Sequence, residues 1–299
     1  MTVHLRGWLL DLYDDAIDGL RLWFITEDGA RISLRQKMEV AFYASGENEV
    51  LRSLWRTLRR YPEVLSLERE LRKDAFITEL IPVLKAVVDS PSNQVRLFRD
   101  IQRLFPDLVY YDADLNSHIR HAARFGTFPM AFCEVEADEA SFIQSIRVLN
   151  SRWDLAPIHP VLRTLFIEPD CDPGRGNPAA LRVRYGRRTQ VMKLSPASEL
   201  IHGLNRILKQ ADPDFVLTNW GDTWLIPRLL ALAGEVGEKL HLNRDEAREV
   251  RWQKEMSYFS YGHIIFRAEE AHLFGRCHID QRSAMMWRDY GLDGVLESA

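Results

Sequence analysis

The sequence predicts an α+β protein with two domains, because of its length and of two different patterns along the chain. With 299 residues, the chain is long enough for about two domains of roughly 100–200 residues each. The first half combines an alternating, strand-like meander with the order strand, helix, strand, strand, helix, strand. The second half follows a segment with two prolines, 153–160, and mixes strands with two longer helices. We therefore expect domains at 1–150 and 151–299, the second one incomplete at its carboxyl end.

The composition excludes several other classes of protein. Hydrophobic residues make up 46% of the chain and charged residues 27%, which is typical of a globular protein. No apolar run reaches the length of a membrane helix and the first residues lack the pattern of a signal peptide, so we expect a cytoplasmic protein that does not contact membranes. The three cysteines have no CxxC spacing, which argues against a disulfide framework or a zinc site.

In the first domain, the alternation of apolar and polar residues predicts an antiparallel meander. The order strand, helix, strand, strand, helix, strand after it predicts a ferredoxin-like subdomain, the topology that RNA-recognition modules share. Both helices of this subdomain carry apolar residues at helical spacing, so each can pack one face on a sheet. The expected strands are 5–13, 20–26, 30–34, 40–44, 64–71, 77–88, 108–111, 132–135 and 143–149, and the expected helical segments are 47–60, 91–105 and 114–125.

In the second domain, the order of elements predicts a mixed sheet of the ribonuclease H type. A loop rich in glycine and proline, 169–178, separates its first two strands. The expected strands are 162–167, 180–185, 189–193 and 215–218, and the expected helices are 195–210 and 224–233.

The segment 212–227 carries the most specific motif of the chain. Its letters, DPDFVLTNWGDTWLIP, resemble the second exonuclease motif of family B DNA polymerases, which usually reads D-P-D-x-I/V-x-T-H/Y-N-G-D-x-F-D-x-P. Gly221, Asp222 and Pro227 fall in register with that motif, and Trp224 replaces its phenylalanine. The catalytic aspartate of the motif falls on Leu225.

Weaker matches to the same family flank this motif in the order that the family has. Upstream, the matching segments are 109–115, 118–120 and 128–130, which resemble the end of the family's amino-terminal domain. Downstream, the matching segments are 257–263, 275–280 and 290–297, which resemble the elements before its third exonuclease motif. The resemblance covers nearly the whole chain and implies an amino-terminal domain followed by an exonuclease-like domain.

The family's proofreading site needs carboxylates, because two divalent metal ions must stabilise the attacking and leaving oxygens of a phosphodiester. The family supplies these ligands from D-x-E in motif one, an aspartate in motif two and Y-x-x-x-D in motif three. In this sequence, Phe166 stands at the aspartate of motif one, Glu168 at its glutamate and Leu225 at the aspartate of motif two. Motif three is expected beyond Ala299. We therefore predict no catalytic residue, no metal site and no cofactor; Mg²⁺ is expected only for a complete family member.

A second register of acidic residues provides an alternative. Asp170 and Asp172 form a D-x-D just after a strand, and Asp222 stands three residues before the lost aspartate. An active nuclease could use Glu168, Asp170, Asp172 and a distant residue. We interpret Asp170 and Asp172 instead as turn residues beside prolines and glycine, and Asp222 as a helix cap.

Nucleic-acid contact is the remaining chemistry that the residues suggest. Of the 39 basic residues 32 are arginine, whose planar fork binds phosphate bidentately. Candidate nucleic-acid-binding residues are Arg184, Arg187 and Arg188 around a predicted hairpin, with Arg175 and Arg182 before them, and Trp220 and Trp224 beside the family's active-site cleft. Their alternative roles are a charged hairpin tip and core packing. The formal charge of −4 predicts weak, salt-sensitive binding to DNA.

Our leading hypothesis is the amino-terminal and exonuclease-like portion of a bacterial family B DNA polymerase, acting in DNA replication or repair, with its proofreading carboxylates lost. Its remaining role would be to shape the DNA path and support the polymerase core. The polymerase motifs of the family are absent and the chain ends in a predicted helix, 291–299, so we expect the palm, fingers and thumb in cis or as a separate chain. The alternative is a stand-alone module that binds nucleic acid or docks a partner.

Overall fold

The computed structural model describes residues 3–15, 19–74, 76, 78–260, 263–267 and 269–282. The chain forms two compact units, Met1–Pro160 and Val161–Ala299, each of which is described by itself. No helix within the described ranges is long and apolar enough to span a membrane. The predicted helix at 291–299 and the family match at 290–297 lie outside the described residues.

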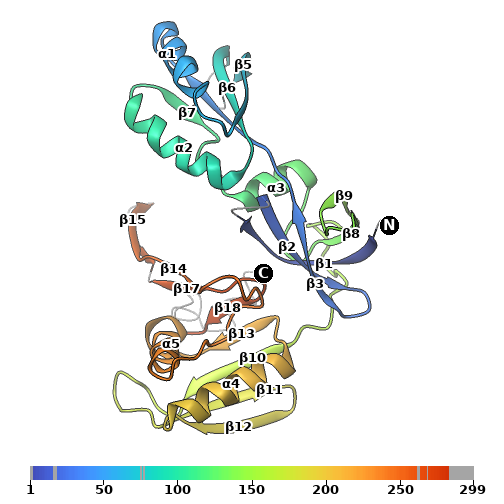
Figure 1. The fold of residues 1–299 in the computed structure, drawn as a ribbon, viewed down its shortest axis with the longest axis vertical. Helices are drawn as coiled ribbons and strands as arrows, with labels where there is room; N and C mark the ends of the chain where they lie inside the picture. Colours follow the sequence, from blue (N-terminus) through green and yellow to red (C-terminus); the bar gives the residue numbers. More distant parts are fainter. Residues whose placement is uncertain are drawn as a thin grey trace. The chain divides into compact units, whose positions relative to one another are not determined.

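The first unit begins with the predicted antiparallel meander, which two later strands extend (Figure 1). The sheet has the order β3-β2-β1-β8-β9, and every neighbouring pair is antiparallel. Helix α3 (Ser117–Phe125) ends at Gly126, whose left-handed conformation (φ 71°) terminates the helix. The strands are β1 (Val3–Asp15), β2 (Gly19–Thr26), β3 (Arg31–Gln36), β8 (Phe132–Ala137) and β9 (Ile143–Val148).

The second sheet of this unit has the predicted ferredoxin-like topology. Its order is β5-β6-β4-β7, all antiparallel, so the connections through the two helices skip one strand each. Leu54 of α1, Ile101 of α2 and Phe42 of β4 are fully buried in the core between the helices and the sheet. The elements are β4 (Val40–Ser45), α1 (Asn48–Leu58), β5 (Val64–Lys73), β6 (Leu80–Val88), α2 (Pro91–Leu104) and β7 (Val109–Tyr111).

The second unit is a mixed five-stranded sheet of the predicted ribonuclease H type. Its order is β12-β11-β10-β13-β18, in which β10, β13 and β18 are parallel and β11 is antiparallel to both of its neighbours. These strands are β10 (Thr164–Pro169), β11 (Ala180–Tyr185), β12 (Arg188–Lys193), β13 (Phe215–Thr218) and β18 (Cys277–Asp280). Two small antiparallel pairs complete the described strands: β14 (Arg251–Gln253) with β17 (Glu270–His272), and β15 (Met256–Ser260) with β16 (His263–Arg267), which lie between them in the chain.

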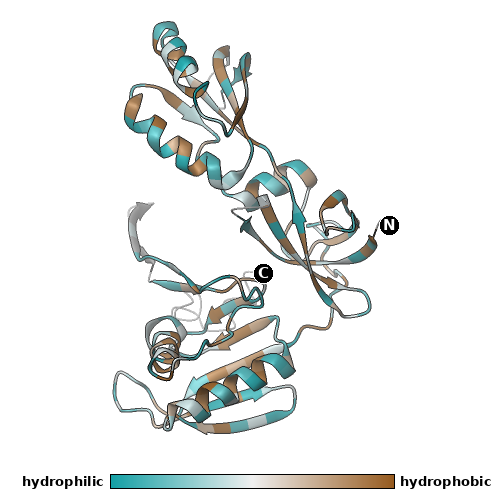
Figure 2. Cartoon of the chain, viewed as in Figure 1, coloured by the Kyte–Doolittle hydropathy of each residue, from teal (hydrophilic) through white to brown (hydrophobic). Residues whose placement is uncertain are grey.

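The two faces of this sheet differ, because successive side chains of a strand point to opposite sides. On one face, Leu165 and Ile167 of β10 and Leu181 and Val183 of β11 are buried against α4 (Ala197–Ala211). Helix α4 shows hydrophobic and hydrophilic stripes, as expected for a helix with one buried side (Figure 2). The opposite face of β10 and β11 carries Phe166, Glu168, Arg182 and Arg184.

The helix predicted at 224–233 begins three residues earlier than expected, and its first turn is wider than an α-turn. A π-helical turn, η1 (Gly221–Leu225), precedes α5 (Ile226–Glu235), and the Leu225 N–H donates to the Trp220 carbonyl oxygen five residues before it. A π-turn of this kind is often found at functional sites. It sets the orientation of the residues that follow β13.

We expect the buried His121 of the first unit to make its stability pH-dependent. His121 is 0% exposed between Thr127 Oγ1 (2.6 Å) and Gln36 Oε1 (2.7 Å), and burial, with His118 and Arg124 nearby, lowers its pKa to about 4. A lowered histidine pKa contributes stability above the unfolded pKa that is lost as the pH falls through the folded one. The free energy of unfolding should therefore decrease by about 3 kcal/mol between pH 7 and pH 4.

Chemical denaturation of the full chain at several pH values measures this decrease. His121→Asn should remove this part of the pH dependence, whereas His118→Asn, on an exposed residue of the same helix, should keep most of it, because burial is the main cause of the shift. An equal pH dependence in wild type and His121→Asn would contradict the assignment.

Candidate nucleic-acid interface

The candidate site lies where the parallel strands β10, β13 and β18 end. The carboxyl ends of parallel strands are the usual position of ligand sites in open α/β sheets. Glu168 stands near the end of β10, Asn219 and Trp220 follow β13, and Arg282 follows β18. A hydrogen bond between Gln281 N–H and the Thr218 carbonyl oxygen (2.9 Å) keeps the last two segments together.

Phe166 supports an arginine at the position where the family has a metal-binding aspartate. It is paired in register with Arg184 of β11, and the Arg184 guanidinium carbon lies 4.2 Å above the centroid of the Phe166 ring. A cation–π contact uses no hydrogen bond of the guanidinium, so its N–H groups remain able to donate. The Arg184 side chain makes no ion pair within the part of the chain that the structure describes.

Glu168 is already paired on both of its oxygens. Its Oε1 accepts a hydrogen bond from Arg182 Nη1 (3.1 Å) and its Oε2 accepts one from Asn219 Nδ2 (2.9 Å). Arg182 is directly opposite Glu168 on β11, and its side chain is 54% exposed. The one carboxylate of motif one that remains is therefore neutralised by a neighbouring strand.

The aliphatic residue of motif two belongs to the core. Leu225 is 1% exposed and lies in the same hydrophobic cluster as Leu229 of α5 and Leu204 of α4. Trp224 is half-buried and packs against that cluster, which is the core-packing alternative for this residue. Leu225 has no atom that could bind a metal.

Trp220 presents an aromatic ring to a second arginine of the edge. Its backbone is left-handed (φ 56°), and its carbonyl oxygen accepts the first hydrogen bonds of η1. The Arg282 guanidinium carbon lies 4.8 Å from the centroid of the Trp220 ring. The next residue must be glycine, because a Cβ at Gly221 would lie 1.9 Å from Thr218 Oγ1 and 2.7 Å from His278 Nε2.

Asp222 and Asp280 are buried and bind backbone groups, so the prediction that Asp222 caps a helix is wrong. Asp222 Oδ1 accepts from Ala271 N–H (2.8 Å), and Asp280 Oδ2 accepts from Asp222 N–H (3.0 Å). His278 Nδ1 lies 3.5 Å from Asp222 Oδ1. Burial raises the pKa of Asp222, against the effect of the hydrogen bond from Ala271. The left-handed Trp220, and not Asp222, flanks the start of the helix.

The hydrogen bonds of Asp170 and Asp172 confirm that both are turn residues. Asp170 Oδ1 accepts from Ala179 N–H (3.1 Å) and Asp172 Oδ1 accepts from Gly174 N–H (2.8 Å). Both bonds close the loop between β10 and β11.

The arginines predicted around the hairpin do not share one face. Arg184 faces Phe166, whereas Arg188 is paired with Tyr185, which packs against the core on the α4 side. Arg187 lies in the exposed turn between β11 and β12. Arg182, which was predicted, shares a face of β11 with Arg184, whereas Arg175 lies in the loop between β10 and β11, 3.8 Å from Asp172 Oδ2. Arg282 was not among the predicted binding residues, because a distant strand brings it to this edge.

We name Arg182, Arg184, Arg282 and Trp220 the basic edge. The ligand positions beside it do not fit the two metal ions of the family's exonuclease, because Phe166, the paired Glu168 and the buried Leu225 occupy them. Among the described residues, no group of three or more His, Cys, Asp or Glu side chains could hold a metal ion. The edge instead presents guanidinium groups, which bind phosphates.

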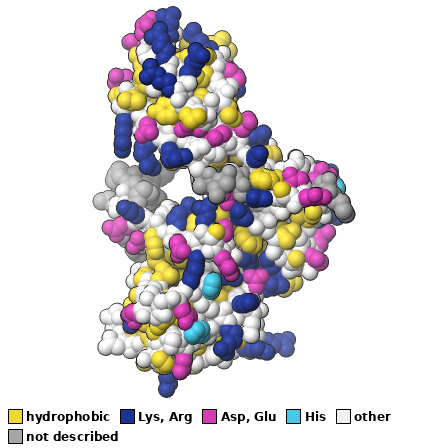
Figure 3. Space-filling view, viewed as in Figure 1, with side chains coloured by type: hydrophobic (Ala, Val, Ile, Leu, Met, Phe, Trp, Pro, Cys, Tyr) yellow, Lys and Arg dark blue, Asp and Glu magenta, His cyan; other side chains and the backbone are white. Residues whose placement is uncertain are grey.

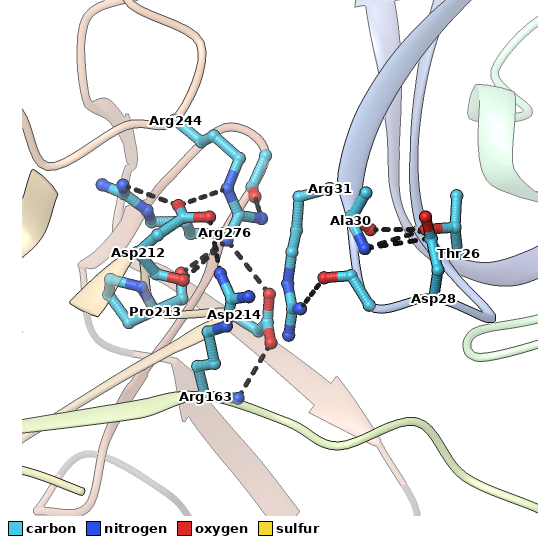
Figure 4. Close-up of polar contacts among 12 residues, drawn as sticks. Thr26, Asp28, Ala30, Arg31, Arg163, Asp212, Pro213, Asp214, Arg244 and Arg276 are labelled. Atoms are coloured by element: carbon cyan, nitrogen blue, oxygen red, sulfur yellow. Dashed lines mark hydrogen bonds and ion pairs between the residues drawn. The ribbon is translucent and has the colours of Figure 1, made fainter. Parts of the chain in front are cut away.

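The other end of the same strands is held by a buried ion-pair network (Figure 4). Arg244 Nε donates to Asp212 Oδ1 (2.9 Å), and its Nη2 donates to Asp214 Oδ1 (3.0 Å). Arg276 Nη2 reaches Asp212 Oδ1 at 3.3 Å. Asp214 Oδ2 accepts from the Arg163 backbone N–H (2.9 Å). The first letters of the motif, Asp212 and Asp214, therefore have a structural role.

The network also determines how Asp212 titrates. Burial works to raise the pKa of Asp212, but the hydrogen bond and charge of Arg244 and the charge of Arg276 outweigh it, so the pKa is lowered. A carboxyl with a lowered pKa contributes stability above its unfolded pKa, and this contribution is lost as the pH falls through the folded pKa.

Replacement of Arg244 should strongly destabilise the second unit. Arg244→Met removes the guanidinium that pairs with Asp214, which is 0% exposed, and removal of one partner of a buried ion pair costs about 3–5 kcal/mol. Arg182→Met is the matched control, because its ion pair with Glu168 is half-exposed and such pairs contribute about 0–1 kcal/mol. Denaturant unfolding measures both; equal losses would show that the network does not stabilise the unit.

Comparison with known proteins supports the fold of the whole chain. No family model and no curated protein sequence matches it. Among solved structures, the family B DNA polymerase from the hyperthermophilic archaeon Pyrobaculum calidifontis matches with a TM-score of 0.68 and 23% sequence identity. The match covers 98% of this chain and 39% of that polymerase. The fold that the resemblance implied is therefore confirmed: both units together have the fold of a part of a family B DNA polymerase.

Proposed function

We propose that the chain is the amino-terminal and exonuclease-like portion of a family B DNA polymerase, and that its exonuclease-like unit holds DNA without cutting it. Phe166 and Leu225 stand at positions where the family has metal-binding aspartates, and the Arg184 guanidinium lies over Phe166. Both observations support this proposal. The fold likeness to a family B polymerase supports the DNA-related part. The palm, fingers and thumb would come from the remainder of the same chain or from a second chain.

The loss of nuclease activity follows from the electrostatics of the basic edge. Two-metal hydrolysis needs several carboxylates that converge on both ions. Here the Arg184 guanidinium lies over Phe166, and Arg182 occupies Glu168. A dication at this place would be repelled by these charges and would find no free carboxylate among the three motif positions.

Retention of a DNA strand needs only phosphate contacts and a surface on which bases can stack. A guanidinium has five N–H donors, and Arg182 uses one hydrogen bond for Glu168, so donors remain for a phosphate. Trp220 offers an aromatic ring for a base, and stacking on such rings contributes about 1–3 kcal/mol per base. Arg187 and Arg188 would add contacts to phosphates at the hairpin tip. Because these contacts are mainly ionic, binding would be weak and sensitive to salt.

Purified chain should not trim the 3′ end of single-stranded DNA. We expect no shortening of a labelled oligonucleotide with Mg²⁺ or Mn²⁺, because the ligand positions of motifs one and two cannot hold the ions. Gel electrophoresis of the products measures this, with an active proofreading polymerase as the positive control. Metal-dependent 3′ trimming that copurifies with the chain would refute the proposal.

Binding of labelled oligothymidylate should depend on the basic edge. For Arg182→Gln combined with Arg184→Gln, we expect an affinity loss of about tenfold at low salt. The slope of log K against log salt concentration should become shallower by about 1.4, because two phosphate contacts on a single strand are lost. Fluorescence anisotropy at several salt concentrations measures both quantities.

A matched control removes two charges from the opposite face of the same sheet. Arg206→Gln combined with Lys209→Gln affects two exposed residues of α4 and should change the affinity less than about twofold. The pair Arg187→Gln and Arg188→Gln shows whether the hairpin tip adds a contact. Equal losses in the edge and α4 variants would mean that binding follows net charge and not the basic edge.

A further inference from the structure

A cavity in the ferredoxin-like subdomain combines an apolar floor with a rim of arginines. It lies between α1 and the strands β5 and β6 and has a volume of about 300 Å³. Leu51 and Trp55 of α1 and Leu84 of β6 belong to its floor. Arg52 and Arg56 of α1 and Arg69 of β5 form its rim. This volume suits one or two large apolar side chains.

The arginines of the rim keep hydrogen-bond donors for a ligand. Arg52 pairs with Glu49, and Arg69 Nη2 donates to Asn48 Oδ1 (3.2 Å), so each guanidinium has most of its five donors left. Arg56 is exposed, and its side chain makes no ion pair or hydrogen bond within the described ranges. In the space-filling view, basic side chains gather over α1 and β5, with hydrophobic side chains among them (Figure 3). A ligand with acidic groups around an apolar centre matches this surface.

Two further features extend the surface on the same side. Helix α1 begins at Asn48 without a side-chain cap, so its first N–H groups add positive potential near the cavity. Strand β5 is the edge of its sheet, and Leu71, which follows Arg69 at the spacing that keeps the same face, is 63% exposed. An exposed sheet edge can accept an extended peptide as an additional strand.

We propose that this cavity docks an acidic peptide segment of a partner protein through one large apolar side chain, with flanking carboxylates on Arg52, Arg56 and Arg69. The apolar anchor would be buried against Leu51, Trp55 and Leu84. Charge-assisted bonds from guanidinium to carboxylate would fix the register of the flanking residues. The site is separate from the basic edge and does not depend on the proposed DNA binding.

The floor favours a peptide over a nucleotide. A nucleobase carries polar atoms on its edge, and burial of such atoms without hydrogen bonds is costly. The floor residues Leu51 and Leu84 have no polar side-chain atom, and Asn48 beside them already accepts from Arg69. An apolar side chain such as Leu, Met or Phe meets no such cost in a floor of leucine and tryptophan.

Peptide display on the full chain tests the proposal. A library of random 12-residue peptides is selected on the wild type and counter-selected on the variant Arg56→Glu with Arg69→Glu. We expect the recovered peptides to share one large apolar residue flanked by Asp or Glu. The best peptide, labelled for fluorescence anisotropy, should bind the double variant at least about tenfold more weakly, because attraction becomes repulsion.

Two controls make the result decisive. Arg59→Glu changes a nearby exposed arginine at the end of α1 that does not line the cavity, and should alter the affinity less than about twofold. Replacement of the apolar anchor of the peptide by serine should abolish binding. Recovered peptides without acidic residues, no enrichment over the double variant, or displacement of the peptide by oligothymidylate at low micromolar concentration would each overturn the proposal.

Discussion

The buried ion pair between Asp214 and Arg244 determines the geometry of the second unit. Asp214 also donates its N–H to the Arg163 carbonyl oxygen (2.7 Å), and its own carbonyl oxygen accepts from Cys277 N–H (2.8 Å). A single residue thus connects the starts of β10, β13 and β18. Its charge is tolerated because Arg244 pairs with it and the backbone of Arg163 satisfies its second oxygen. The register fixed here determines which residues meet at the opposite, carboxyl ends of these strands.

The carboxyl ends of the three strands are held by hydrogen bonds of protein groups. Asp280 accepts from the backbone N–H groups of Asp222 and Arg282, and Asp222 accepts from Ala271. Gly221 allows η1 to approach Thr218 and His278 closely. The acidic residues Asp222 and Asp280 thus bind the backbone, while the positions at which the resembling family has metal-binding aspartates carry Phe166 and Leu225. This division explains how the fold is maintained without carboxylates at Phe166 and Leu225.

Most of the fold could be predicted because it depends on local patterns. The period of two along β10 and β11 and the helical spacing along α1, α2 and α4 are visible in short windows. The aromatic and aliphatic substitutions at Phe166 and Leu225 could be read from the motif. The partners of Asp212 and Asp222 could not, because Arg244 and Ala271 follow 30 or more residues later and their approach depends on the sheet order. The π-turn at Gly221 likewise results from packing.

The charge of the basic edge is a local property that the formal charge of −4 does not describe. At physiological salt, charges are screened beyond about 8 Å, so a phosphate at the edge responds to the groups around it and hardly to the rest of the chain. These groups are three arginines and the carboxylates of Glu168, Asp222 and Asp280. Arg182 is paired with Glu168 and the two aspartates bind backbone N–H groups, while Arg184 and Arg282 lie over aromatic rings. An aromatic ring orients a guanidinium without neutralising it. At Phe166, an aromatic side chain thus stands where the resembling family has a metal ligand, and it holds the Arg184 guanidinium without a counter-charge.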